Sequence, residues 1–273
     1  MEYHKVRDWQ KRPELNRLKD LSNPPKELFY IGKWNPDIFQ NCVGVVGSRR
    51  ITNYGKQAIE KIIPQLVFNK KTIVSGFMYG VDQYSHEICA ANGGKTIAIL
   101  GWGIDYKLSG YDLQLAKKII KTDGLIISEW RTQKPTLWTF PSRNRIVAAL
   151  SREVIIIEAA LKSGSLITAR LATKLKRKIW AVPGPITSRT SAGTNNLIAT
   201  NKANIWLADI KPDPKIIANS DPILDILLNE SLTADEIARK LGKSISQVGA
   251  QLSLLNLNGQ LVERGGKYYL NDN

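Results

Sequence analysis

The sequence predicts a doubly wound, mostly parallel α/β sheet followed by a small winged-helix domain. Short β-branched runs alternate with helical stretches through the middle of the chain, a pattern typical of βαβ units. The runs are continuously apolar, as expected for parallel strands that are covered on both faces. Near the C-terminus the pattern changes to three helices and a hairpin. We expect an N-terminal extension (1–27), the α/β domain (28–210), a linker with two prolines (211–220) and the winged helix (221–273).

Six apolar runs are expected to form the parallel strands, with helical segments between them. The expected strands are Val43–Val46, Thr72–Ser75, Thr96–Leu100, Leu125–Ser128, Val154–Ile157 and Ile179–Val182. The expected helices are Gly55–Val67, Gly80–Asn92, Leu113–Lys121, Arg143–Ala149 and Leu166–Lys174. Because ligands of open α/β sheets bind beyond the carboxyl ends of the strands, we expect functional residues in the loops at that edge.

Polar capping residues open the C-terminal helices. Asp221 is expected to cap the first helix, and Thr233 the second, where Glu236 three residues later has the spacing of a capping box. Ser244 is expected to cap a third helix, and Leu261–Leu270 to form a hairpin around a Gly-Gly turn. These elements together predict the winged helix-turn-helix.

The charge of the chain is concentrated outside the winged helix. The formal net charge is +15, yet residues 221–273 carry five basic and seven acidic side chains, which leaves +17 on residues 1–220. Such a charge favours a polyanionic partner, because each neutralised phosphate releases counterions. The expected third helix of the tail, Ile245–Asn256, contains no Lys or Arg, so this domain is better suited to a protein contact. The α/β domain is therefore the better candidate for binding DNA.

The cysteine, histidine and apolar content excludes several classes of protein. The two cysteines, Cys42 and Cys89, predict no disulfide framework, and a reducing compartment fits. The two histidines, His4 and His86, are too few for a typical zinc cluster, and we expect no metal or other cofactor. No apolar run is long enough to span a bilayer, so we expect a cytoplasmic protein without a membrane partner.

The first strand ends in Gly47, Ser48, Arg49 and Arg50. Backbone N–H groups and a hydroxyl there, together with two guanidinium groups, can bind an anion at the sheet edge. The G-x-G-x-x-G fingerprint of dinucleotide sites is absent. The motif therefore indicates either an anion site or a plain tight turn.

A second candidate anion site follows the strand near Ile157. Ser163, Gly164 and Ser165 open a helix there, and spare N–H groups at a helix start can hold a phosphate. The motif lacks the G-x-x-x-x-G-K-[ST] pattern of nucleotide P-loops. Arg143 and Arg145 lie two positions apart on another helix, so we expect one to reach the ligand while the other pairs within the core.

Other chemistry-bearing residues have two interpretations each. Asp82 and His86 are four positions apart on one helix face, so they could form a catalytic pair, although we favour a structural histidine that Asp82 orients. Trp102, Trp130 and Trp138 follow strands or lie in the loops beyond them. Their indoles could stack on bases or fill the core, and the core role is the more common one.

Taken together, these segments resemble the DprA (Smf) family of DNA-processing proteins. The motifs that carry the resemblance are Val46–Arg49, Ser75–Gly76, Gly80–Asp82, His86, Thr96–Gly101, Ser128–Glu129, Phe140–Arg145, Ser163–Ala169, Ala181–Gly184 and Gly193–Asn195. The resemblance implies a Rossmann-like fold that binds single-stranded DNA, usually as a homodimer. It also implies delivery of that DNA to the recombinase RecA in natural transformation, without enzymatic activity.

The resemblance also implies a set of DNA contacts centred on Arg49. Neighbouring residues expected to line the same path are Gly47, Ser48, Arg50, Gly76, Lys107, Arg143, Asn144, Ser163, Gly164, Ser165 and Thr168. The chain departs from the family pattern at Met78 and Tyr79, which replace the usual Ala and Arg. One cation is thereby lost, and a ring that could stack on a base takes its place.

Two other functions fit parts of the sequence. The sheet also resembles that of nucleoside-monophosphate phosphoribohydrolases, which carry Pro-Gly-Gly-x-Gly-Thr followed by a catalytic Glu. This chain has Lys162–Thr168 at the equivalent place and no Glu after it. A sequence-specific regulator acting through the winged helix is the other alternative, against which the uncharged helix Ile245–Asn256 argues.

Overall fold

The computed structural model describes residues 1–207, 221–227, 230–258 and 260–270 in two compact units. The first unit lies within residues 1–208 and the second within residues 209–273. The expected linker, residues 211–220, lies outside the described residues. No helix within the described ranges is both long and apolar enough to cross a membrane.

The first unit is built on one nine-stranded sheet in the order β1-β2-β6-β5-β4-β3-β7-β8-β9. The strands β3 to β9 run parallel, while β1 and β2 are antiparallel to their neighbours. Their bounds are β1 (His4–Lys5), β2 (Phe29–Ile31), β3 (Cys42–Val46), β4 (Thr72–Ser75), β5 (Thr96–Ile99), β6 (Leu125–Ser128), β7 (Glu153–Ile156), β8 (Lys178–Ala181) and β9 (Asn204–Ile205). The predicted doubly wound, mostly parallel sheet is confirmed.

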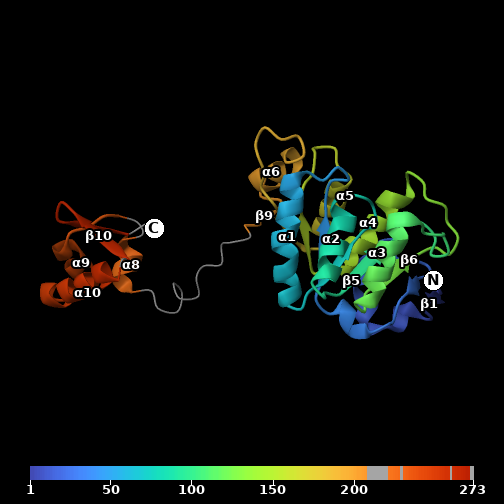
Figure 1. Ribbon diagram of the computed structural model, residues 1–273, viewed down its shortest axis with the longest axis horizontal. Coiled ribbons are helices and arrows are strands. Elements are labelled where there is room, and N and C mark those ends of the chain that lie inside the picture. Colours follow the sequence, from blue (N-terminus) through green and yellow to red (C-terminus); the bar gives the residue numbers. More distant parts are fainter. Residues whose placement is uncertain (208–220, 228–229, 259, 271–273) are drawn as a thin grey trace. The chain divides into compact units, whose positions relative to one another are not determined.

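Helices cover both faces of the sheet (Figure 1). One face packs against α1 (Asn53–Phe68), α2 (Val81–Ala91) and α3 (Gly110–Lys121). The other packs against α4 (Thr139–Leu150), α5 (Ser165–Lys174), α6 (Ala192–Ala199) and the 3-10 segments η1 (Trp9–Lys11), η2 (Pro13–Asp20) and η3 (Pro36–Phe39). Residues of β3 alternate between the two cores, which explains why the strands are continuously apolar in sequence.

The N-terminal residues join this unit rather than standing apart from it. Strand β1 pairs with β2 at the sheet edge, and Leu15 and Leu18 of η2 are buried in the same core as α4 and α5. Helix α4 begins four residues before its predicted start at Arg143. Pro141 lies in its first turn, where the missing N–H of proline costs no hydrogen bond.

The direction of winding reverses between β3 and β7. From β3 the chain builds β4, β5 and β6 on one side, and it then returns to place β7, β8 and β9 on the other. The loops that leave the carboxyl ends of β3 and β7 therefore diverge, and they open a crevice at this point. The two candidate anion motifs, after β3 and after β7, lie at this crevice.

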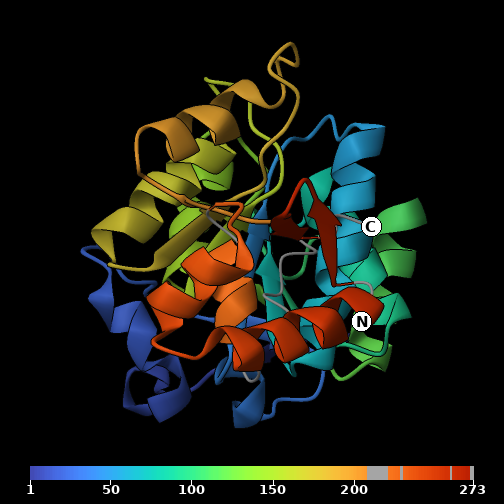
Figure 2. The same ribbon diagram turned by 90° about the vertical axis from the view of Figure 1, so that its left-hand side faces the viewer.

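The second unit consists of α8 (Pro222–Leu227), α9 (Ala234–Leu241), α10 (Ile245–Leu257) and the hairpin β10 (Leu261–Arg264) and β11 (Lys267–Leu270) (Figure 2). The predicted winged helix is confirmed. The carboxylate of Asp221 accepts a hydrogen bond from the Ile223 amide at 3.0 Å, and Thr233 and Ser244 both form capping boxes. Apolar residues from all three helices and from β10 form a separate core.

Candidate nucleic-acid interface

A cleft of about 700 Å³ opens at the reversal point of the sheet. Eleven of the twelve residues singled out from the sequence line it: Gly47, Ser48, Arg49, Arg50, Gly76, Arg143, Asn144, Ser163, Gly164, Ser165 and Thr168. Lys107 does not, because its loop lines a smaller hollow next to the cleft. The residues of the cleft come from the ends of β3, β4, β7 and β8 and from the starts of α4 and α5.

The loop after β3 is fixed tightly against the start of α2. The Ser48 hydroxyl accepts from the Arg50 amide at 3.0 Å and donates to the Arg50 carbonyl at 3.0 Å, while the Val81 amide donates to the Ser48 carbonyl at 3.1 Å. Gly80 has a φ of +89°, and a side chain there would overlap the carbonyl oxygens of Ser48 and Arg49. The backbone from which Arg49 projects is therefore well defined.

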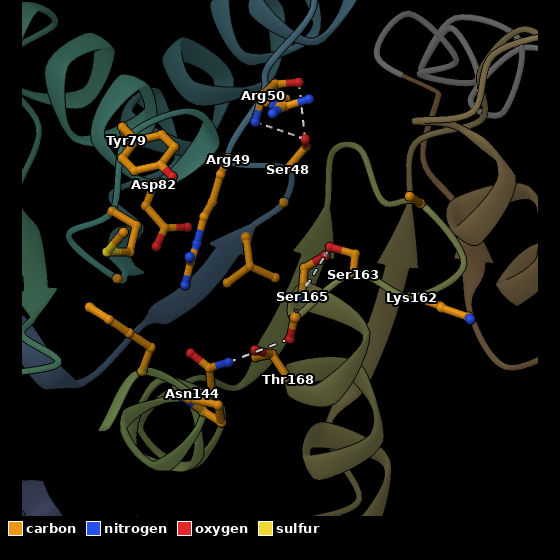
Figure 3. Close-up of a pocket in the computed structure, with 18 of the residues that line it drawn as sticks. Ser48, Arg49, Arg50, Tyr79, Asp82, Asn144, Lys162, Ser163, Ser165 and Thr168 are labelled. Atoms are coloured by element: carbon orange, nitrogen blue, oxygen red, sulfur yellow. Dashed lines mark hydrogen bonds between the residues drawn. The ribbon is translucent and has the colours of Figure 1, made fainter. Parts of the chain in front are cut away.

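The Arg49 side chain is exposed and extends into the cleft between the α2 side and the loop of Ser163 (Figure 3). Its guanidinium carbon lies 5.2 Å from the ring centroid of Phe140, a cation–π contact. Within the described ranges Arg49 forms no ion pair. Its charge is thus available to a ligand.

Arg143 forms part of the cleft wall and is only 3% exposed. It donates to the Ile99 carbonyl and to the Asn144 side chain, and its Nη2 lies 3.7 Å from Asp82 Oδ2. Burial lowers the pKa of Arg143 and raises the pKa of Asp82, and each partner offsets the shift of the other. Gly76 allows this packing, since a side chain there would overlap both charged groups.

The prediction that one of Arg143 and Arg145 pairs within the core holds for Arg145. It binds Glu129 through both terminal nitrogens, at 2.7 and 2.6 Å, and donates to the Asn23 carbonyl at 2.9 Å. Arg143 reaches the cleft, but its guanidinium is also engaged by the protein. It therefore holds the cleft wall in place more than it offers a free charge.

The start of α5 has an open donor group. Ser163 and Ser165 share a hydrogen bond of 2.8 Å between their hydroxyls, and the Asn144 amide donates to the Gly164 carbonyl at 3.4 Å. The backbone N–H of Gly164 has no partner among the described residues, and the space beside its Cα is empty. This arrangement can hold an anion by a backbone N–H at the positive end of a helix.

Sequence reasoning missed several residues that line the cleft, most clearly Arg189. Arg189 lies in the loop after β8, where Thr190 donates to the buried Glu158 carboxylate at 3.2 Å. The same carboxylate accepts from the Thr52 amide at 2.9 Å at the start of α1. Every strand that ends at this edge can contribute a ligand contact, so the rule applied to β3 and β7 would have found the β8 loop as well.

The predicted contact between Asp82 and His86 is wrong. His86 is fully buried, and its ring nitrogens lie 2.7 Å from Thr96 Oγ1 and 2.6 Å from the Gly76 carbonyl oxygen. Asp82 faces Arg143 instead. Burial lowers the pKa of His86 to about 4, so the ring is neutral and structural. Among the described residues no three His, Cys, Asp or Glu side chains gather in a group that could hold a metal ion.

The three tryptophans after strands differ in exposure. Trp102 is buried against Phe77 and Phe140, which agrees with the core interpretation. Trp138 is exposed and meets Trp130 edge to face, with ring centroids 5.7 Å apart. Neither Trp130 nor Trp138 lines the cleft.

Two protein families match consecutive parts of the chain. Residues 6–212 match the family described as DNA recombination-mediator protein A, and residues 212–267 match the DprA winged helix domain. The boundary between the two matches falls close to the boundary between the two structural units.

Individual relatives are moderately similar in sequence. The DNA processing protein DprA of Streptococcus pneumoniae is 39% identical over 71% of this chain and 71% of its own length. Protein Smf of Escherichia coli is 32% identical over 94% of this chain and 74% of its own length. Protein Smf of Synechocystis is 38% identical over 72% of this chain, but the match spans only 50% of that protein.

Two solved structures are similar in fold. The X-ray structure of S. pneumoniae DprA has a TM-score of 0.66 at 34% identity and covers 80% of this chain and 74% of its own. DprA from Helicobacter pylori also has a TM-score of 0.66, at 29% identity, with 84% of this chain and 97% of its own covered. The latter structure is described as showing a unique single-stranded DNA binding mode.

Proposed function

The chain belongs to the DNA recombination-mediator protein A family, that of DprA and Smf, and we propose that it binds single-stranded DNA in the cleft at the carboxyl ends of β3 and β7. The observation that carries the proposal is the charge around the cleft. Four exposed cations line it, Arg49, Arg50, Lys162 and Arg189, and none has an ion-pair partner in the described part of the chain. The acid among the lining residues, Asp82, is already paired with Arg143.

Unpaired cations around a concave surface favour the phosphates of a nucleic acid. Figure 3 shows Ser163 and Ser165 on the other side of the cleft from Arg49, and the N–H of Gly164, which lies between them in sequence, adds a directed donor at the start of α5. A strand that crosses the reversal point would meet Arg49 on one side and this helix start on the other. The single-stranded DNA binding described for the H. pylori structure supports the same ligand.

A single strand suits this cleft better than a duplex. The cleft has a volume of about 700 Å³ and several loops surround it, and the buried Arg143 forms part of its inner wall. The bases of a single strand can turn into such a hollow, whereas in a duplex they are paired and stacked inside the helix. We therefore infer a preference for single strands that comes from the shape of the cleft and not from base sequence.

A binding role fits the residues better than a phosphoribohydrolase reaction. Such a reaction needs a carboxylate that is free to act on the substrate. In the described part of the cleft wall, Asp82 is held beside Arg143, and Glu158 lies outside the lining, where it binds Thr52 and Thr190. Incubation with AMP followed by detection of released adenine tests this alternative, and we expect no adenine.

Membership in the family supports a wider role. We propose that the protein acts in the cytoplasm as a homodimer that loads the RecA recombinase onto the bound strand during natural transformation. Sedimentation of the full chain tests the dimer. RecA filament formation on DNA coated with single-strand binding protein, measured with and without the chain, tests the loading.

The binding proposal is tested by anisotropy of a labelled oligonucleotide, single-stranded or in a duplex, over a salt series. We expect tighter binding of the single strand and an affinity that falls steeply as salt increases. Equal affinity for both forms would overturn the proposed preference. An affinity that does not respond to salt would overturn the assignment of the four cations to phosphates.

A further inference from the structure

A second hollow of about 320 Å³ adjoins the cleft. Met78, Tyr79 and Phe140 line both spaces, so the two are continuous along one wall. Figure 3 shows Tyr79 on this wall, beside Asp82 on the α2 side of the cleft. The volume of the second hollow lies within the range of roughly 300–1,000 Å³ that is usual for small-molecule sites. Part of a DNA strand that is bound in the cleft can therefore reach into the second hollow.

The walls of this hollow are aromatic. Trp102 packs edge to face against Phe77, Tyr106 and Phe140, with ring centroids 6.2 to 6.3 Å apart. Tyr106 and Tyr79 are 50% and 56% exposed, so their rings are accessible to a ligand. Exposed rings next to a nucleic-acid site provide stacking surfaces for bases.

The polar groups of the hollow differ from those of the cleft. It has one cation, Lys107, and one carboxylate, Asp112. Gln83 is 8% exposed, and its amide nitrogen donates to Asp112 Oδ1 at 2.8 Å and to the Phe77 carbonyl at 3.4 Å. The amide nitrogen of Gln83 is thus already engaged, so Gln83 and Asp112 offer a ligand only acceptor oxygens. A carboxylate repels a phosphate, and acceptors attract amino groups.

We propose that this hollow binds a nucleobase of the strand whose phosphates lie in the cleft, and that it prefers a base with an exocyclic amino group. This inference rests on the proposed function of the cleft. The base stacks on Tyr106, and its amino group donates to the carboxylate of Asp112. Cytosine and adenine carry such a group at the base edge, and thymine does not. The chain should therefore bind single strands with a bias in base composition.

The test compares oligo-dC with oligo-dT of equal length, binding to the full chain at one salt concentration. Both are pyrimidine strands, so the bases are similar in size, and oligo-dU, which lacks the thymine methyl group, shows whether a difference comes from the amino group. We expect several-fold tighter binding of oligo-dC, and loss of that difference in Asp112→Leu, which has no acceptor oxygen. Equal binding of both strands by the unmodified chain would overturn the preference for an amino-bearing base.

Tyr106→Ala tests the hollow itself. We expect about tenfold weaker binding of strands that carry bases, because stacking on a single ring contributes about that factor, and we expect Tyr106→Phe to restore the affinity. Tyr111→Ala is the matched control, since Tyr111 is similarly exposed on α3 but lies outside the hollow. A strand made of abasic sites should bind the unmodified chain and Tyr106→Ala equally well.

Failure of this inference is distinguishable from failure of the proposed function. If Arg49→Ala weakens binding and Tyr106→Ala does not, the cleft binds DNA and the base site is refuted. If neither substitution changes the affinity, the proposed function fails together with the inference. A thermal unfolding curve for each variant excludes loss of the fold, which we do not expect for the exposed Arg49, Tyr106 and Tyr111. Asp112 is partly buried and accepts from Gln83, so its variant needs this control most.

Discussion

Replacing Arg49 by Ala removes a cation that Figure 3 shows extending into the cleft at the carboxyl ends of β3 and β7. Its guanidinium has no ion-pair partner in the described chain; it lies over the Phe140 ring and interacts at longer range with the charges of Asp82 and Arg143, which have opposite signs. The substitution should therefore leave stability almost unchanged. One charged hydrogen-bonded contact to a phosphate contributes about 1.5–3 kcal/mol. The dissociation constant for a single strand should therefore rise by about 10- to 150-fold.

The same substitution should also change the response to salt. The slope of log K against log salt should become less steep by about 0.7, the value for one phosphate of a single strand. Arg49→Lys keeps the charge but loses the planar two-point donor, so its affinity for a single strand should lie between those of the unmodified chain and of Arg49→Ala. Arg170→Ala is the matched control, because Arg170 is exposed on α5 and does not line the cleft.

The assay is anisotropy of a labelled oligonucleotide at several salt concentrations, with a thermal unfolding curve for each variant. The reasoning is refuted if Arg49→Ala leaves both the affinity and the slope unchanged. It is also refuted if Arg170→Ala weakens binding as much, since the charge of the whole surface would then matter and not the cleft.

Three further predictions concern the fold and the site. Gly76→Ala places a methyl group against both Asp82 and Arg143, so it should lower the melting temperature and weaken DNA binding together, as calorimetry and anisotropy would show. The pKa of His86 is lowered to about 4 in the folded chain, so stability present above pH 6.5 should be lost as the pH falls toward 4, by about 3 kcal/mol; denaturant titrations should show this slope, and His86→Gln should lack it. Thr233→Ala removes the capping box of α9 and should destabilise the C-terminal unit by about 1 kcal/mol; unfolding of a fragment from residue 209 onward would measure it, and an unchanged midpoint would contradict the capping role.

Local sequence signals were sufficient for most of the fold. Continuous apolar runs identified the six central strands, since each is covered on both faces, and the polar caps at Thr233 and Ser244 fixed two helix starts that the structure confirms. The strands β1, β2 and β9 were not predicted. The edge strands β1 and β9 have two residues each and β2 has three, which is too short to leave a hydrophobic pattern in the sequence.

The candidate site could be predicted only where a strand end carries an informative motif. Gly47–Arg50 and Ser163–Ser165 follow two strands directly, so both were found. The spacing of Asp82 and His86 suggested a contact that the fold does not make, because Thr96 on a neighbouring strand and the Gly76 carbonyl occupy the histidine nitrogens. Such partners are distant in sequence or belong to the backbone, and helical spacing carries no information about them.

The central claim, that single-stranded DNA lies in the cleft at the carboxyl ends of β3 and β7, is tested most directly by photo-crosslinking. A single strand with iodouracil at several positions would be bound to the full chain and irradiated, and the crosslinked peptides identified by mass spectrometry. The account predicts crosslinks in the segments that line the cleft, 46–50, 76–82, 140–144 and 160–168. Crosslinks confined to residues 221–273 would place the DNA on the winged helix and contradict it.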